Sequence, residues 1–120
     1  IFTTCKTICP VMTATMLQTQ HHLADADLRP EFVSITIDPE FDNAATLREY
    51  ATRYGAKWTF LTGSRADVTS VLQAFDAYRG AKANHIAVTL LRAPNAPQWT
   101  RVEGLASADQ LAKLWRDITS

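Results

Sequence analysis

The chain has 120 residues, of which 47% are hydrophobic and 20% charged, and its 12 lysines and arginines balance 12 aspartates and glutamates. This length and composition predict a single globular domain, residues 1–120, large enough to bury a core without cross-links. The zero net charge argues against nucleic acid as a partner. The sequence contains no apolar run of about 18 residues, the length needed to span a membrane.

The chain opens on an apolar fragment, Ile1-Phe2-Thr3, which has the character of the last residues of a buried strand. Because Ile1 is not an initiator, we expect an N-terminal portion before it that holds the rest of this strand and could carry a signal or a membrane anchor. Apolar residues at helical spacing then predict a helix over about 7–26. Pro10 suits its first turn, and Pro30 lies just beyond its end.

Three further strands are predicted from runs of β-branched and aromatic residues, at 31–37, 57–62 and 85–91. A Pro-Asn-Ala-Pro turn at 94–97 should return the chain as an antiparallel partner strand over 98–102. Helical periodicity predicts helices over 43–54 and about 65–77, and a last helix that opens at a Ser107–Gln110 capping pattern. The side chains expected to point inward from the third and fourth helices are Val68, Val71, Leu72, Phe75, Leu111, Leu114, Trp115 and Ile118.

This order of elements predicts an α/β fold with a central mixed sheet flanked by helices. The strand–helix–strand units at the front imply parallel pairing, and the closing hairpin and helix add an antiparallel edge. A pair of cysteines lies where the first strand meets the first helix, which is the thioredoxin-like placement. Chemistry in such sheets gathers at the carboxyl ends of the strands. The fold is expected to be thioredoxin-like, with its N-terminal strand or strands incomplete.

Cys5 and Cys9 are the only cysteines, spaced C-x3-C and followed by Pro10. The free N–H groups and the dipole at a helix start stabilise a thiolate, and Lys6 adds a nearby positive charge. A thiolate can attack a disulfide or bind a soft metal ion. Two less specific alternatives remain at this point: a pair of small buried apolar residues, or a structural disulfide closing a very short loop.

The spacing of the two cysteines separates this loop from two common redox sites. An ordinary thioredoxin-type oxidoreductase has C-x-x-C. A peroxiredoxin has Thr three residues before its reactive cysteine, whereas Phe2 and Lys6 occupy that position before Cys5 and Cys9. The wider spacing leaves room for a metal ion between the two sulfurs.

Several motifs, taken together and in order, resemble the Sco/SenC family of thioredoxin-fold copper proteins, which serve assembly of the dinuclear copper site of cytochrome c oxidase. The resemblance extends over nearly the whole chain. It is carried by F-T-x-C-x3-C-P at 2–10, F-V-S-I-T-I-D-P-E-F-D at 32–42, L-x-x-Y-A-x-x-Y at 47–54, W-x-F-L-T-G at 58–63, and His85 before a strand.

The resemblance implies that Cys5, Cys9 and His85 are copper ligands. Two thiolates suit Cu(I), and an added imidazole lets a site hold Cu(II) as well. The implied function is that of a copper-binding metallochaperone, which delivers copper to the oxidase copper site or reduces its cysteines. The implied partner is the copper-site subunit of the oxidase, or another copper or thiol protein. The implied location is the bacterial periplasm with an inner-membrane anchor, or the mitochondrial intermembrane space.

Two other functions remain open. The chain could be an enzyme, a thiol–disulfide oxidoreductase that uses Cys5 and Cys9 without copper transfer, with His85 only modulating a thiolate. It could also be a partner-binding module that uses the site as an interaction surface. The first alternative requires both cysteines, and the second requires neither.

Other potential ligands are better explained by structure. His21 and His22 are adjacent and point about 100° apart on a helix, so we expect surface residues. Met12 and Met16 share a helical face with Cys9, and core packing is favoured over a methionine-assisted copper site. Asp38 could orient a ligand or simply form an Asp-Pro turn.

Overall fold

The computed structural model describes residues 1–26, 28–78, 80 and 87–119. The elements follow the predicted alternation, although most are shorter than the sequence patterns suggested. In chain order they are α1 (Ile8–His22), β1 (Val33–Ile35), α2 (Ala44–Tyr54), β2 (Thr59–Leu61), α3 (Arg65–Ala74), β3 (Val88–Leu91), β4 (Thr100–Glu103) and α4 (Ala108–Thr119). None of the helices formed by these residues is long and apolar enough to cross a membrane.

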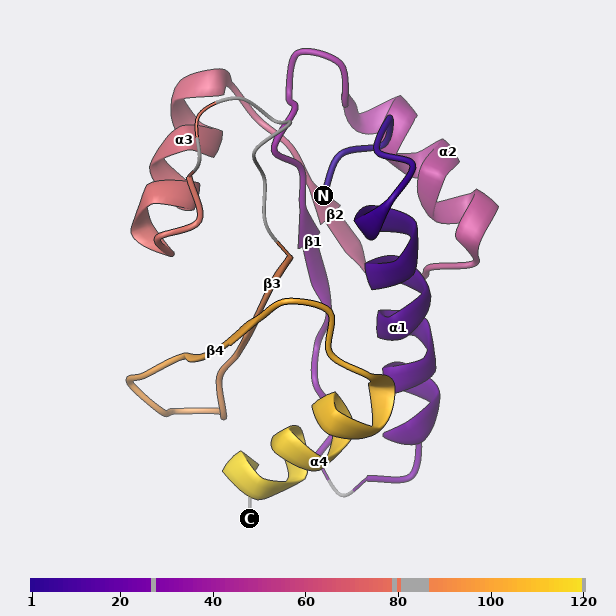
Figure 1. Ribbon diagram of the computed structural model, residues 1–120, viewed down its shortest axis with the longest axis vertical. Helices are drawn as coiled ribbons and strands as arrows, with labels where there is room; N and C mark the ends of the chain where they lie inside the picture. The colour runs from indigo at the N-terminus through magenta and orange to yellow at the C-terminus, as the bar shows by residue number, and fades with distance from the viewer. Residues whose placement is uncertain (27, 79, 81–86, 120) are drawn as a thin grey trace.

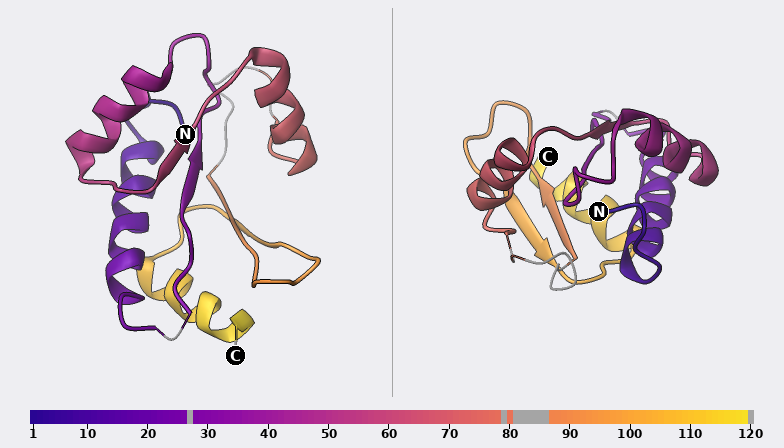
Figure 2. Two further views of the ribbon diagram at one scale, coloured as in Figure 1. Left: turned by 180° about the vertical axis from the view of Figure 1, so that it is seen from behind. Right: turned by 90° about the horizontal axis from the view of Figure 1, so that it is seen from above.

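The strands form two hydrogen-bonded pairs. β1 pairs with β2 in parallel, and β3 pairs with β4 as an antiparallel hairpin, as the sequence predicts for each pair. Within the described residues these are two separate two-stranded sheets, so the single central mixed sheet we expected is not one continuous ladder there. Figures 1 and 2 show α1 and α2 on one side of the β1–β2 pair and α3 on the other.

Ile1 lies beside β1 as the end of a parallel strand. Its nitrogen donates to the Ile35 carbonyl at 3.1 Å, and its carbonyl accepts from the Ile37 N–H at 2.7 Å. Ile1 thus bonds to the residues on either side of Thr36, which is the hydrogen-bond pattern of a parallel ladder. On the other side of β1, Thr36 donates to the Leu61 carbonyl at 3.0 Å. β1 is therefore bonded on both sides, which confirms its predicted central place.

Aromatic side chains fill the space between α2 and the β1–β2 pair. Tyr50 is 2% exposed, and its ring lies 6.1 Å from that of Phe60. Trp58 stacks on Phe60 at 5.8 Å and donates from its indole nitrogen to Ser34 at 2.9 Å. These contacts bury large apolar surfaces while satisfying the one indole donor, so they fix α2 against the sheet.

The C-terminal helix packs along α1. Ser107 and Gln110 exchange the two predicted capping bonds, at 2.9 Å and 3.1 Å, so the helix begins where the sequence predicts. Trp115 is buried against Leu23 and donates to the Leu28 carbonyl at 2.7 Å. α4 thereby holds the far end of α1, the helix whose first turn carries Cys9.

α3 is less buried than its periodicity suggests. Val68 is buried as predicted, but Val71 is 37% exposed, which contradicts its expected inward position. The helix is attached mainly at its ends. Arg65 pairs with Glu40 at the first turn, and Arg101 donates to the Phe75 and Asp76 carbonyls just beyond the last turn. Because polar links at the termini fix its place, its middle does not have to pack inward.

Candidate dithiol and metal site

The two cysteines lie at the junction predicted from sequence, between the end of the Ile1 strand and the start of α1. Cys5 precedes the helix and donates its N–H to the Phe2 carbonyl at 3.1 Å, which closes a tight turn. Cys9 belongs to the first turn of α1 and has no exposed surface, while Cys5 is 7% exposed. They are not joined by a disulfide, and they form one apolar cluster with Phe2.

The sulfur of Cys5 occupies the place where a capping oxygen is normally found. The first N–H groups of a helix have no partner within the helix and usually receive one from a Ser, Thr, Asp or Asn side chain. Thr7 is the N-cap residue of α1, but its side chain makes no capping bond. Its hydroxyl instead lies 3.6 Å from Cys5 Sγ, and the backbone of Thr7 and Cys9 hydrogen-bonds to that sulfur.

The two thiols are electrostatically unlike. Burial by itself acts to raise the pKa of Cys5, but the hydrogen bonds from Thr7 and Cys9 outweigh it and lower the pKa to about 6. Burial raises the pKa of Cys9 to about 11. The expectation of a stabilised thiolate is thus met at Cys5 and reversed at Cys9. At neutral pH the arrangement is a Cys5 thiolate hydrogen-bonded by a Cys9 thiol.

A buried carboxylate beneath the loop was not singled out from the sequence. Asp42 has no exposed surface and accepts from the Thr3 N–H at 2.9 Å, from the Thr3 hydroxyl, and from the Thr36 hydroxyl at 2.8 Å. Thr3 precedes Cys5 by two residues, and Thr36 directly follows β1. Two signals were available: Asp42 ends the motif at 32–42, and it follows a central strand at the sheet edge where the dithiol was expected.

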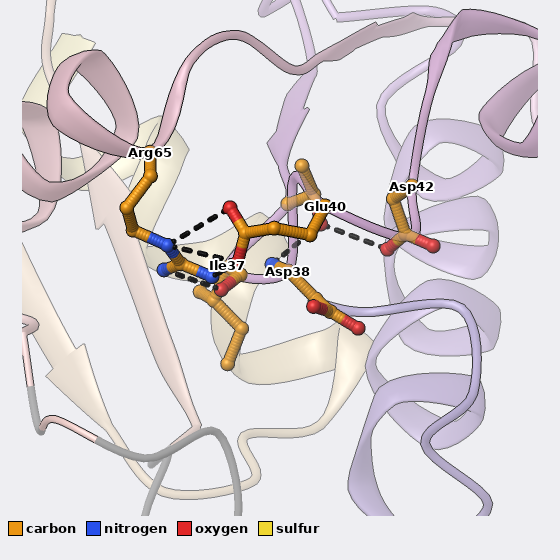
Figure 3. Close-up of polar contacts among 6 residues, drawn as sticks. Ile37, Asp38, Glu40, Asp42 and Arg65 are labelled. Atoms are coloured by element: carbon orange, nitrogen blue, oxygen red, sulfur yellow. Dashed lines mark hydrogen bonds and ion pairs between the residues drawn. The ribbon is translucent and has the colours of Figure 1, made fainter.

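Asp38 is buried at the same edge and forms the predicted Asp-Pro turn. Its N–H donates to the Thr36 hydroxyl at 3.0 Å, and its carbonyl accepts from Phe41 and Asp42 at 3.2 Å and 2.9 Å. Figure 3 shows Asp38 and Asp42 on this turn, with Arg65 approaching Glu40 from the side of α3. The turn role is confirmed, and an orienting role of the Asp38 side chain toward a ligand stays a prediction.

The alternative ligands behave as the sequence suggests. Met12 and Met16 are half-buried and line a small cavity between α1 and the segment that leads into α4. His21 and His22 are exposed, and His22 Nδ1 lies 3.1 Å from Asp109 of α4. Neither histidine lies with the cysteines.

His85, the third predicted ligand, lies outside the described residues. Among the residues that the structure does describe, no three or more His, Cys, Asp or Glu side chains gather into a group that could hold a metal ion. The described part of the site is therefore a pair of sulfurs at a helix start, supported by a buried carboxylate.

An α/β chain of this order, with a thiolate–thiol pair where the first strand enters the first helix, has a thioredoxin-like fold. Within that class the chain belongs to the SCO1/SenC family, whose model matches residues 1–119. The resemblance noted from the motifs is thereby confirmed.

Two curated relatives match the chain over part of its length. The SCO1 protein homolog of Bacillus subtilis strain 168 is 38% identical over 82 residues, which cover 64% of this chain and 42% of the relative. The human mitochondrial SCO1 homolog is 33% identical over 81 residues, covering 64% of this chain and 26% of the relative. The chain thus matches less than half the length of each.

Solved structures share the fold over 98% of the chain. A SCO1/SenC family lipoprotein from Bacillus anthracis str. Ames has a TM-score of 0.82 at 24% identity, with 76% of it covered. BsSco, described as a member of the Sco family of cytochrome c oxidase assembly proteins with a disulfide switch, has a TM-score of 0.78 at 27% identity, with 75% covered. Bradyrhizobium japonicum ScoI with copper bound has a TM-score of 0.63 at 15% identity, with 80% covered, and supports the fold alone.

Proposed function

We propose that this protein is a copper metallochaperone of the Sco type, which binds copper through Cys5, Cys9 and His85. It delivers the ion to the dinuclear copper site of cytochrome c oxidase, or reduces the cysteines of that site beforehand. The observation that carries the proposal is the pair of buried cysteine sulfurs at the start of α1, with the Thr7 hydroxyl 3.6 Å from Cys5 Sγ. Family membership adds support, because BsSco is described as belonging to a family of cytochrome c oxidase assembly proteins.

The donors present fit copper. Thiolate sulfur is a soft ligand that favours Cu(I), and an imidazole suits Cu(II). Cys5 carries the negative charge at neutral pH, whereas Cys9, whose pKa is raised to about 11, must release a proton when it becomes a ligand. Copper uptake should therefore release protons, and affinity should rise with pH.

Titration of the reduced protein with Cu(I) and with Cu(II) tests this proposal. We expect one equivalent to bind, with binding lost in Cys5→Ser and Cys9→Ser and Cu(II) affinity reduced in His85→Ala. His21→Ala is the matched control, because it removes an exposed imidazole from the other end of α1. If the native protein binds neither ion at one equivalent, the copper proposal is wrong.

The difference in pKa between Cys5 and Cys9 also favours a second function, thiol–disulfide exchange. The Cys5 thiolate would attack one sulfur of a partner disulfide, forming a mixed disulfide and releasing the other sulfur as a thiolate. Cys9, after losing its proton, would attack the Cys5 sulfur, closing the Cys5–Cys9 disulfide and releasing the second partner thiolate. Cys9→Ser should trap the mixed disulfide and Cys5→Ser should not. Equal activity of a variant without either cysteine would eliminate this function.

We infer a location outside the cytoplasm: the bacterial periplasm with an inner-membrane anchor, or the mitochondrial intermembrane space. One structural relative is described as a lipoprotein, and one curated relative as mitochondrial. Fractionation of cells that express the full gene product, followed by salt and detergent extraction of membranes, tests the compartment and the anchor. Recovery in the cytoplasmic fraction would contradict the inference.

A further inference from the structure

The Asp42 carboxylate connects the dithiol loop to the central strand. One oxygen, Oδ2, accepts both the Thr3 N–H at 2.9 Å and the Thr36 hydroxyl at 2.8 Å, and the other accepts the Thr3 hydroxyl. With no exposed surface on Asp42, water does not compete for these bonds. Hydrogen bonds to a charged acceptor in such a setting are stronger than those between neutral groups.

Two of the three bonds hold Thr3, in the segment that leads to Cys5, and the third joins Asp42 to Thr36 after β1. Thr3 is held from both its backbone and its side chain, and only Thr4 separates it from Cys5. On the other side, Cys5 is fixed by the first turn of α1, through its bonds with Thr7 and Cys9. The loop is thus pinned before and after the reactive sulfur.

The turn that carries Asp42 is itself held from α3. Arg65 Nε lies 3.1 Å from both carboxylate oxygens of Glu40, and Arg65 Nη1 donates to the Ile37 carbonyl at 3.3 Å. Figure 3 shows Arg65 on one side of the turn and Asp42 on the other. The turn that positions the Asp42 carboxylate is therefore itself held in place by Arg65.

We propose that Asp42 is a positioning residue for the dithiol: through Thr3 it holds Cys5 at the start of α1, in contact with Cys9. This inference deepens the proposed function, because it concerns the same two sulfurs, but it makes a claim that does not require copper. In the reduced protein, the bonds between Asp42 and Thr3 keep the two sulfurs together. When these bonds are lost, the dithiol form gains loop conformations that the disulfide form cannot adopt. Closing the disulfide therefore becomes less favourable.

Equilibration with glutathione buffers measures this effect without metal. Cys5 and Cys9 give up two protons and two electrons to one oxidised glutathione, forming one internal disulfide and two reduced glutathiones. We expect Asp42→Ala and Thr3→Val to lower the equilibrium constant for closure about tenfold, which corresponds to a reduction potential about 30 mV less negative. Thr3→Ser keeps the hydroxyl and should stay close to the native value.

Thr19→Val is the matched control for stability. Thr19 lies on α1, the helix that carries Cys9, and is 4% exposed. Its hydroxyl donates to the Thr15 carbonyl at 2.7 Å, away from the dithiol loop. This variant should lower the melting temperature and leave the glutathione equilibrium unchanged. If Asp42→Ala does not fold, Thr3→Val carries the test, because it keeps the carboxylate and its bond with Thr36.

Two outcomes separate this inference from the proposed function. If the folded Thr3→Val and Asp42→Ala variants keep the native equilibrium constant while the native protein binds copper, the positioning role is wrong and the metallochaperone proposal stands. If the variants shift the equilibrium and the native protein binds no copper, the positioning role stands and the metallochaperone proposal fails.

Discussion

The Thr7 hydroxyl lies 3.6 Å from the Cys5 sulfur, at the point where α1 begins. Thr7 is the N-cap residue but leaves capping to that sulfur, so the helix start and the reactive group stabilise each other. The backbone that begins the helix thereby also decides which of the two cysteines carries the negative charge.

The first prediction concerns the reactivity of Cys5 in the metal-free, reduced protein. Only the thiolate reacts with iodoacetamide, so the rate should follow ionisation of Cys5, with a midpoint near pH 6. Cys9→Ser isolates this reaction, and mass spectrometry locates the adduct. A midpoint near the ordinary thiol value would show that the hydrogen bonds at the start of α1 do not hold a thiolate.

The second prediction concerns stability against pH. The pKa of Cys5 is lowered in the folded protein from an ordinary value of 9.0 to about 6. The unfolded chain therefore binds more protons between these values, and the contribution of Cys5 to the free energy of unfolding rises as pH increases from 6 to 9. It is complete above 9 and lost as pH falls through 6.

Urea unfolding of the reduced protein across this pH range, compared with Cys5→Ser, measures the contribution of Cys5. The difference between the two proteins should increase with pH up to about 9. Cys9 acts in the opposite sense at higher pH, because its pKa is raised to about 11 and its contribution is lost as pH rises through that value. A difference that does not change with pH would contradict the assignment.

The third prediction concerns the buried pair of hydroxyls that joins α1 to α2. Thr13 and Tyr50 are both 2% exposed, and their oxygens lie 2.9 Å apart. Tyr50→Phe leaves the Thr13 hydroxyl without this partner and should lower the free energy of unfolding by about 1–3 kcal/mol. The double variant with Thr13→Val should cost less than the sum of the two single changes. Strictly additive losses would show that the pair is not coupled.

The fourth prediction concerns the attachment of α3. Arg101 of β4 donates to the Phe75 and Asp76 carbonyls, which places a cation just past the end of the helix. Arg101→Leu should make backbone amides of 65–74 exchange with solvent faster, and leave protection in α1 unchanged. Arg116→Leu on α4 serves as a control, since its bond with the His22 carbonyl holds α4 to α1 instead. Unchanged exchange in α3 would show that the apolar contact of Val68 suffices.

Local patterns predict the order of elements and the place of the dithiol, because periodicity, caps and turns are properties of neighbouring residues. The Ser107–Gln110 cap and the Pro94–Pro97 turn region are examples. Asp42 was missed because its role depends on Thr3, 39 residues away. Val71 was misplaced because a helical face shows which side is apolar, but not whether another element covers it. The opposite pKa shifts of Cys5 and Cys9 follow from burial and hydrogen bonding that spacing alone does not contain.

The ladder bonds of Ile1 limit how far the cysteines can travel. Ile1 is fixed to β1 on one side of the loop, and Ile8 begins α1, whose far end is held by α4. Only six residues separate these two fixed points, so the loop that carries Cys5 is short. Both cysteines are also buried: Cys5 is 7% exposed and Cys9 has no exposed surface. Cysteines held in this way cannot swing out to collect a cargo. Whatever exchanges with them, an ion or a partner's thiol, has to come in to the sulfurs.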